Sequence, residues 1–211
     1  MRWHQRASMM LEPLRSVCMN CTMCPLGRAK HVHNNKPLKE YRVFSTMTPS
    51  KFVVLGQNPG YNECVQGKVF VGDAGKNLNK EIEKHGLTRD SFYISNAVKC
   101  HTPKNRAPQF EEASACASIL RLELSILRPL LVVTLGASAL DIMCPGIKLS
   151  EGLGHAVESK SFGVKVLPIY HPSPRNLTIQ ARRNRFEKDI RILCKLVNNL
   201  KDKYEGVLKD L

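Results

Sequence analysis

The stretch Phe52-Val-Val-Leu-Gly-Gln-Asn-Pro-Gly60 joins a short, apolar, β-rich run to a polar segment that favours a turn. Three further β-rich runs follow downstream, and segments with helical spacing separate them. Strands that alternate with helices pair in parallel through helical crossovers. The chain is therefore predicted to be an α/β protein, with three α/β/α layers around a central, mainly parallel, four-stranded sheet. The predicted strands span 52–55, 92–95, 130–135 and 164–170.

Four segments with helical spacing complete this pattern, and no repeat or linker divides the chain of 211 residues. That length suits a single domain with its own core. We expect one domain over 1–211, with an N-terminal cysteine segment at 18–24 packed against it. The predicted helices span 76–85, 109–127, 137–143 and 178–200.

Polar and turn-forming residues follow each predicted strand at its carboxyl end. Gly56 to Gly60 follow the first strand, Asn96 follows the second, Gly136 follows the third, and His171 follows the fourth. Open parallel sheets bind ligands at this edge. The sequence therefore predicts the functional site there.

Four of the eight cysteines have a spacing typical of metal ligands. Cys21 and Cys24 form a C-x-x-C motif, while Cys100 and Cys116 form a wider pair in a later segment. Thiolates bind zinc or an iron–sulfur cluster, and the wide second pair favours a [4Fe–4S] cluster over zinc. The alternative is a set of unrelated buried thiols. Cys18 extends the first motif but is interpreted as a bystander.

The charge balance favours a polyanionic partner. The chain has 32 Lys and Arg against 18 Asp and Glu, a net charge of +14, and many of the basic residues lie within 175–191. Nucleic acid is the first candidate, and a merely basic soluble protein is the alternative. The N-terminus lacks the apolar stretch of a signal peptide, and no run is long enough to span a membrane. We expect a protein that is not secreted and has no membrane partner, and that is either cytoplasmic or associated with the nucleoid or host DNA.

Taken in order, the motifs resemble those of the uracil-DNA glycosylase superfamily, most closely its iron–sulfur family 4. This resemblance covers 18–191 and implies a monomeric DNA glycosylase of base excision repair. Such an enzyme flips uracil out of single- or double-stranded DNA and hydrolyses its N-glycosidic bond, leaving an abasic site. The motifs are C-T-M-C-P-L, G-Q-N-P-G-Y-N-E, G-K-V-F-V-G-D-A-G-K, I-S-N-A-V-K-C, L-R-P-L-L-V-V-T-L-G and H-P-S-P.

The resemblance also implies roles for particular residues. It places a [4Fe–4S] cluster on the four cysteines of the two pairs. Phe70 would stack on the flipped base beside Gly56, and Asn96 would read the uracil edge, because an amide offers a donor and an acceptor side by side. His171 would stabilise the negative charge that develops on the departing uracil.

The motif Gly56-Gln57-Asn58-Pro59-Gly60 departs from family 4, which usually has G-E-A-P-G. Asn58 aligns with residues that position water in other families, but an amide can only orient water and cannot take its proton. Gln57 and Glu63 are the other catalytic candidates, with Glu63 either activating water or shaping the pocket. Gly60 stands where family 1 has a tyrosine that excludes the methyl group of thymine.

The segment after His171 corresponds to the loop that enters DNA in the superfamily. Arg175 occupies the position of the inserted side chain, and Leu177 is the alternative. Downstream arginines are candidates for phosphate contacts, with a solvated basic helix face as the alternative. The predicted DNA-binding residues are Ser173, Pro174, Arg175, Leu177, Arg182, Arg183 and Arg185.

Two other functions remain open at this point. The amide Gln57, in place of the usual glutamate, is compatible with a DNA-binding or replication accessory protein that has weak or no hydrolysis. An iron–sulfur electron carrier is less compatible, because it would leave the polar residues at the strand ends unexplained.

Overall fold

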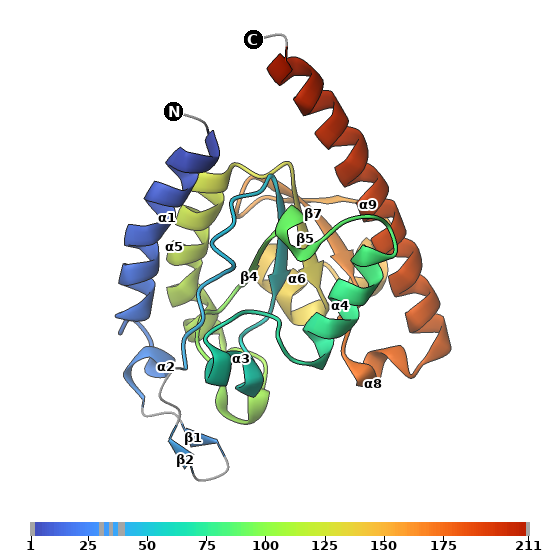
Figure 1. Ribbon diagram of the computed structural model, residues 1–211. Helices are drawn as coiled ribbons and strands as arrows, with labels where there is room; N and C mark the ends of the chain where they lie inside the picture. Colours follow the sequence, from blue (N-terminus) through green and yellow to red (C-terminus); the bar gives the residue numbers. More distant parts are fainter. Residues whose placement is uncertain (1–2, 30–31, 34–35, 38–40, 210–211) are drawn as a thin grey trace.

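A five-stranded sheet lies at the centre of the computed structural model (Figure 1). β3 (Phe52–Gly56) pairs in parallel with β4 (Tyr93–Asn96) and β5 (Leu131–Leu135), and β5 pairs in parallel with β7 (Val164–Ile169). The predicted α/β fold with a mainly parallel sheet is confirmed. The structure describes residues 3–29, 32–33, 36–37 and 41–209.

The sheet has one strand more than the four predicted. β6 (Val157–Ser159) pairs antiparallel with β7 at the edge, with Val157 opposite Val166. It has only three residues, and two of them, Glu158 and Ser159, are polar. Three residues are too few to show the alternation of apolar and polar residues by which a strand is recognised in a sequence. The pairing of β6 therefore depends on the neighbouring strand.

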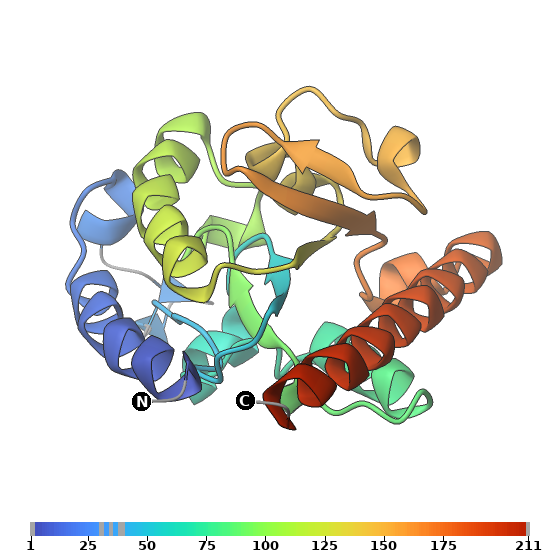
Figure 2. The same ribbon diagram turned by 90° about the horizontal axis from the view of Figure 1, so that it is seen from above.

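Helices lie on both faces of the sheet, as the view from above shows (Figure 2). All four predicted helices are present. The helix predicted at 137–143 has those bounds, the other three have shifted ends, and the last one continues well beyond its predicted end. The helices are α1 (Trp3–Met19), α2 (Pro25–Arg28), α3 (Tyr61–Gln66), α4 (Asp73–Glu83), α5 (Phe110–Leu127), α6 (Ala137–Met143), α7 (Leu149–Gly152), α8 (Pro174–Leu177) and α9 (Gln180–Lys209). Smaller elements are β1 (Val32–His33), β2 (Lys36–Pro37) and the 3-10 turns η1 (Arg89–Ser91) and η2 (Pro103–Asn105).

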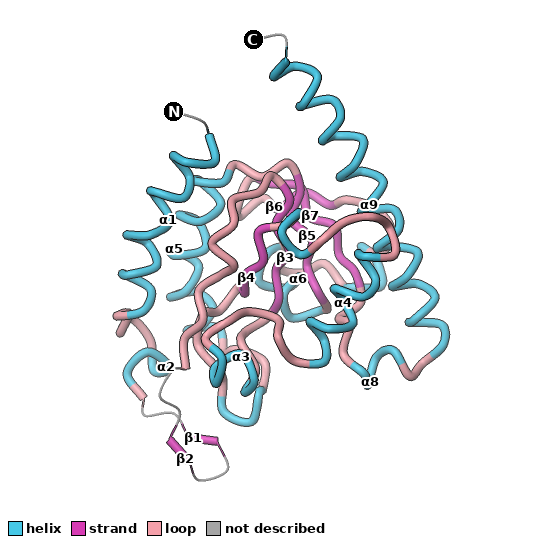
Figure 3. The backbone as a smooth tube through the Cα atoms, viewed as in Figure 1, coloured by secondary structure: helices cyan, strands magenta, loops and turns pink. Residues whose placement is uncertain are grey.

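Each face of the sheet has its own apolar core, because successive strand residues point to opposite faces. Val54 and Val133 pack with α4 and α9 on one face. Val53 and Val132 pack with α1, α5 and α6 on the other. The strands thus lie between two helical layers (Figure 3).

Helix α1 was not predicted, although its buried residues have helical spacing. Ala7, Leu11, Leu14 and Cys18 form its buried face and pack against α5 and the sheet. Pro13 inside the helix and the polar first turn hide this pattern. The helix brings the N-terminal cysteines to the body of the protein. In the described part of the chain, no helix combines the length and apolarity needed to cross a membrane.

Candidate active site and cysteine site

The carboxyl ends of the parallel strands bring the predicted polar residues together. Gly56 at the end of β3 lies directly opposite Asn96 at the end of β4. The Gly136 N–H that follows β5 donates to Ile169 at the end of β7, at 2.8 Å. A Cβ on Gly136 would lie 3.1 Å from the Cβ of His171. The predicted convergence of these segments at one edge is therefore present.

Gly56, Phe70 and Asn96 form the tightest part of this edge. A side chain at position 56 would clash with the Asn96 amide and with the Phe70 ring. Only glycine lets these two side chains approach the strand end so closely. Phe70 itself has a positive φ of 51°, a conformation that costs energy for a non-glycine residue and is found at functional sites.

The side-chain Nδ2 of Asn96 is buried and has no hydrogen-bond partner among the residues that the structure describes. An unsatisfied buried N–H costs about 1–3 kcal/mol. Asn96 therefore has an unused donor at this edge of the sheet, where the Phe70 ring also lies. A planar ligand with a carbonyl group would satisfy it.

His171 lies on the other side of this group. Its ring centre is 6.4 Å from that of Phe70, with the two planes tilted by 38°. Burial lowers the pKa of His171 below its ordinary value, and the negative charge of Glu63 only partly opposes this effect. The imidazole is therefore neutral at pH 7, with one ring N–H to donate.

Two amides that sequence reasoning missed fix the backbone around His171. Asn176 Nδ2 donates to the carbonyl of His171 at 3.0 Å, and Asn77 Nδ2 donates to the carbonyl of Pro172 at 2.9 Å. Asn77 lies on α4, almost a hundred residues earlier in the chain. No local pattern marks such a partner.

Glu63 shapes the site through its two oxygens. Its Oε1 accepts hydrogen bonds from the backbone N–H groups of Val71 at 2.9 Å and Gly72 at 2.8 Å. A Cβ on Gly60 would lie 2.7 Å from its Oε2. The carboxylate thus holds the segment after Phe70 and fills space beside Gly60.

Arg89 also holds the segment around Phe70, through its carbonyl groups, and the sequence analysis did not predict this role. Its guanidinium donates to the carbonyl of Phe70 at 3.0 Å and to the carbonyl of Val69. Burial lowers the pKa of Arg89. Together, Glu63 and Arg89 fix the unusual backbone of Phe70.

Gln57 and Asn58 form an amide pair that a second loop supports. Gln57 Nε2 donates to Asn58 Oδ1 and to the carbonyl of Arg106 at 3.0 Å. Asn58 Nδ2 donates to Asn105 Oδ1 at 3.0 Å. The Asn58 amide is therefore held by both of its polar atoms, and its Oδ1 keeps a second lone pair for a water molecule.

The supporting loop is itself fixed by an ion pair. Arg106 donates to Glu112 through Nη2 at 2.6 Å and Nη1 at 2.8 Å. The hydrogen bonds from Arg106 lower the pKa of Glu112. Glu112 also accepts from the backbone N–H of Gln109 at the start of α5, at 2.7 Å. This loop, with Asn105, was not among the predicted site residues.

The predicted DNA-entering segment forms the short helix α8 and its N-cap, Ser173. Pro174 and Arg175 are exposed, while Leu177 is half-buried and packs against the core. Arg175 is therefore the more available of the two predicted wedge residues.

The three downstream arginines differ in their surroundings. Arg185 forms an ion pair with the buried Asp189 at 2.9 Å, which offsets its charge. Arg182 donates to Asn176 at 3.0 Å and lies over the ring of Tyr170. Arg183 is exposed and donates to the carbonyl of Leu177 at 2.8 Å. Arg183 is thus the best placed for phosphate, while Arg182 supports the His171 segment through Asn176.

The four predicted metal-binding cysteines line one cavity. Cys21 and Cys24 lie between α1 and α2, Cys100 follows β4, and Cys116 lies on α5. Cys18, interpreted as a bystander, lines the same cavity. Burial raises the pKa of Cys116 to about 11 and that of Cys18 to about 12. A metal bound by Cys116 would displace the proton of that thiol.

The four thiols that line this cavity are donors suited to zinc or to an iron–sulfur cluster. Among the residues that the structure describes, no three His, Cys, Asp or Glu side chains are placed to hold a single metal ion. A single zinc needs its ligands to converge tetrahedrally, whereas the irons of a [4Fe–4S] cluster each take one thiolate around a larger body. Arg42 secures the cysteine loop by donating to the carbonyls of Met19 at 3.0 Å and Gly27 at 2.7 Å.

Comparison with protein families adds a match over most of the chain. The family model described as the uracil DNA glycosylase superfamily matches residues 44–194, which contain the whole central sheet and His171. Sequence similarity to individual relatives extends further toward the termini.

Three of these relatives are as follows. The type-4 uracil-DNA glycosylase of Thermotoga maritima is 34% identical over 178 residues, which cover 82% of this chain and 88% of the relative. The type-4 uracil-DNA glycosylase of Archaeoglobus fulgidus is 32% identical over 198 residues, covering 88% and 92%. The type-5 uracil-DNA glycosylase of Pyrobaculum aerophilum is 33% identical over 186 residues, covering 75% and 80%.

Proposed function

Because the chain belongs to the uracil DNA glycosylase superfamily, we propose that it releases uracil from DNA by hydrolysing the N-glycosidic bond, leaving an abasic site. It is an enzyme that acts on DNA, like the curated relatives of types 4 and 5. One observation supports particular residues for this role. Among the described residues, the buried Nδ2 of Asn96 has no hydrogen-bond partner, and Asn96 lies with Phe70 beside Gly56.

Asn96 reads the uracil edge in this proposal. Its Nδ2 donates to O4 of the base, and its Oδ1 accepts from N3–H. Cytosine has an amino group in place of O4, so it would set a donor against the donor of Asn96. Phe70 stacks on the flipped base, and Gly56 leaves room for both contacts.

His171 lowers the barrier to bond cleavage. As the glycosidic bond breaks, its electron pair passes to the uracil, and negative charge develops on O2. A neutral imidazole N–H aimed at O2 stabilises that charge more in the transition state than in the bound substrate. The hydrogen bonds from Asn77 and Asn176 keep the histidine segment in place for this contact.

Asn58 orients the water that attacks the sugar. Its amide is fixed by Gln57 and Asn105, and the free lone pair of Oδ1 accepts a hydrogen bond from the water. An amide takes no proton, so the water attacks late, once the sugar carries most of the positive charge. Water then supplies the hydroxyl of the abasic sugar, and its proton leaves to solvent.

The cysteine site would hold a [4Fe–4S] cluster on Cys21, Cys24, Cys100 and Cys116. The shared cavity and the thiol donor set support this assignment. When bound, the cluster would supply a structural cross-link between the N-terminal segment and the sheet. The hydrolysis needs no electron transfer, and Cys18 would remain a neighbouring thiol.

The net charge of +14 favours the approach of DNA. Arg175 enters the duplex from α8, and Arg183 contacts a phosphate. Ser173 and Pro174 set the direction of that helix. In this proposal the enzyme acts as a monomer, and one chain supplies all of these groups.

A second function is kept open by one observation. Gln57 and Asn58 are both amides, so neither side chain can accept a proton from the attacking water. A protein of this fold with weak or no hydrolysis would act as a DNA-binding accessory module. The excision assay below separates the two.

The test uses labelled oligonucleotides with uracil in a single strand, opposite guanine and opposite adenine. An oligonucleotide with thymine opposite guanine is the control for base selectivity. After incubation, alkali cleaves any abasic site. Strand cleavage at uracil but not at thymine is expected. Binding to all of the duplexes without cleavage would leave only the accessory function.

A further inference from the structure

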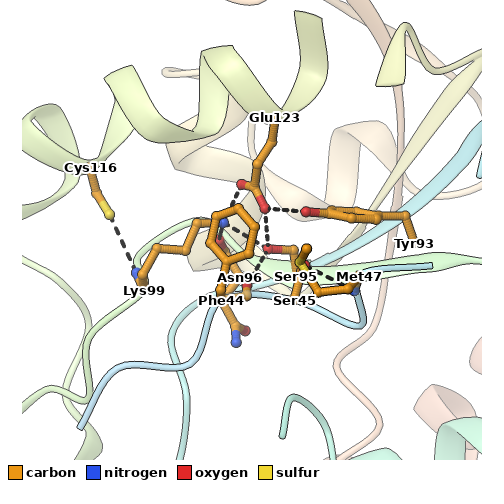
Figure 4. Close-up of polar contacts among 9 residues, drawn as sticks. All are labelled: Phe44, Ser45, Met47, Tyr93, Ser95, Asn96, Lys99, Cys116 and Glu123. Atoms are coloured by element: carbon orange, nitrogen blue, oxygen red, sulfur yellow. Dashed lines mark hydrogen bonds and ion pairs between the residues drawn. The ribbon is translucent and has the colours of Figure 1, made fainter. Parts of the chain in front are cut away.

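A lysine is completely buried between the proposed base-reading residue and the cysteine site. Lys99 is 1% exposed, and its partner Glu123 on α5 is fully buried. Figure 4 shows the lysine side chain reaching back toward the carboxyl end of β4. A buried charge of this kind is retained only where its partners satisfy it.

The ammonium group of Lys99 has three partners for its three N–H groups. It donates to the Glu123 carboxylate, to Ser95 Oγ at 2.7 Å and to the backbone carbonyl of Asn96 at 2.7 Å. The Glu123 carboxylate also accepts from Tyr93 Oη at 2.7 Å. The network is therefore satisfied on both sides and fixes the direction of each bond.

The backbone around Lys99 extends this network in both directions. The Lys99 N–H donates to Cys116 Sγ at 3.3 Å. Ala97 donates to the carbonyl of Gly56 at 2.8 Å, and Val98 donates to that of Gln57 at 2.9 Å. Residues 96–100 thus join the base-reading amide, the Gly56 turn and a cysteine of the proposed cluster site.

Stability alone does not explain why Lys99 and Glu123 form a buried ion pair here. Apolar residues of similar size often stabilise a core as well as a buried ion pair does, because the two charges lose their hydration. The distinctive contribution of Lys99 is directional, since its bond to the Asn96 carbonyl fixes the peptide that carries the amide.

We propose that Lys99, held by Glu123, is a positioning residue that fixes Asn96 for base reading and links it to the cysteine site. This rests on the proposed function, because it assigns Lys99 to the reaction through Asn96. Lys99 does not touch the substrate.

The test variant is Lys99→Met with Glu123→Gln. It removes both charges together, so no unpaired ion is left buried. The glutamine still accepts from Tyr93, and the methionine keeps the length of the lysine stem. Lys51→Met is the matched control, because Lys51 Nζ also donates to backbone carbonyls, those of Leu127 at 2.8 Å and Arg128 at 3.2 Å, at the far end of α5.

Single-turnover excision with enzyme in excess separates positioning from stability. A smaller folded fraction raises the half-saturating enzyme concentration but leaves the limiting rate of the bound complex unchanged. The double variant should lower the limiting rate by about 10–100-fold, since a misplacement of about 1 Å has effects of this size. Its half-saturating concentration should stay within about twofold of wild type. The Lys51→Met control should keep the wild-type limiting rate.

Hydrogen exchange tests the same inference without relying on activity. The peptide covering Tyr93 to Val98 should exchange faster in the double variant than in wild type, and Lys51→Met should leave it unchanged. An unchanged peptide together with an unchanged limiting rate would overturn the inference. Absence of excision by wild type would refute the proposed function instead, and the exchange result alone would then decide whether Lys99 positions this segment.

Discussion

Glu63 fills the space beside Gly60: its Oε2 lies 2.7 Å from the point where a Cβ at position 60 would stand. The resemblance of the motif to family 1, inferred from the sequence, implies that a tyrosine excludes the methyl group of thymine at this position in that family. Here the carboxylate takes that space from three residues further along the chain. The backbone N–H groups of Val71 and Gly72 hold it there.

Glu63→Ala should therefore weaken discrimination against 5-substituted bases. The ratio of single-turnover rates for uracil and for 5-methyluracil should fall by roughly tenfold, the scale of one or two lost pocket contacts. Glu63→Gln is the matched control, since it fills the same space and still offers an oxygen to Val71 and Gly72. Equal ratios in wild type and Glu63→Ala would show that another side chain excludes the methyl group.

Asn58 should respond to substitution as a group that orients water. Asn58→Ala should lower the limiting single-turnover rate, while Asn58→Asp should restore or raise it, because a carboxylate accepts a proton at the same position. Gln57→Glu should help only if that side chain faces the water. If Asn58→Ala kept the wild-type rate, the water would have to be held elsewhere.

Asn96→Asp should reverse the hydrogen-bonding pattern offered to the base. A carboxylate repels O4 of uracil and loses the Nδ2 donor, so uracil excision should fall by about 10²-fold or more. Asn184→Asp, on the exposed face of α9, controls for the added negative charge. Uracil selectivity that survived Asn96→Asp would remove Asn96 from base reading.

A [4Fe–4S] cluster at the cysteine site should make the protein coloured. Purified without oxygen, the wild type should be brown and contain about four irons per chain. Cys100→Ala and Cys116→Ala should lose both colour and soluble yield. Cys194→Ala, on the buried face of α9, and Cys18→Ala should keep the colour. A colourless wild type with one zinc would refute the cluster.

The strands and their carboxyl ends could be predicted because the information is local. Phe52–Gly56 combines an apolar run with a turn signal, and Asn96 and His171 each stand at the end of a similar run. Alternation between strands and helices then determines that these ends meet at one edge. Nothing in this inference requires knowledge of a distant contact.

The supporting residues could not be predicted, since they act across long separations in sequence. Arg89 reaches the carbonyl of Phe70, and Asn105 reaches Asn58, without any spacing or motif that marks either partner. In the sequence, nothing distinguishes Lys99 from the other basic residues of a strongly basic chain. Its burial against Glu123 depends on how α5 packs on β4, which only the folded structure reveals.

Substitution of His171 tests most directly the claim that this protein excises uracil, because in the proposed mechanism His171 stabilises the departing uracil. The measurement is the limiting single-turnover rate of uracil excision for wild type, His171→Ala and the exposed control His155→Ala. His171→Ala should lower the rate by about 10²–10³-fold, the effect of removing one donor to a developing anion, with little change in DNA affinity. The wild-type rate should show no step as the pH falls through 6.5, since burial keeps the pKa of His171 below that ordinary value. A His171→Ala rate equal to those of wild type and His155→Ala would contradict the account.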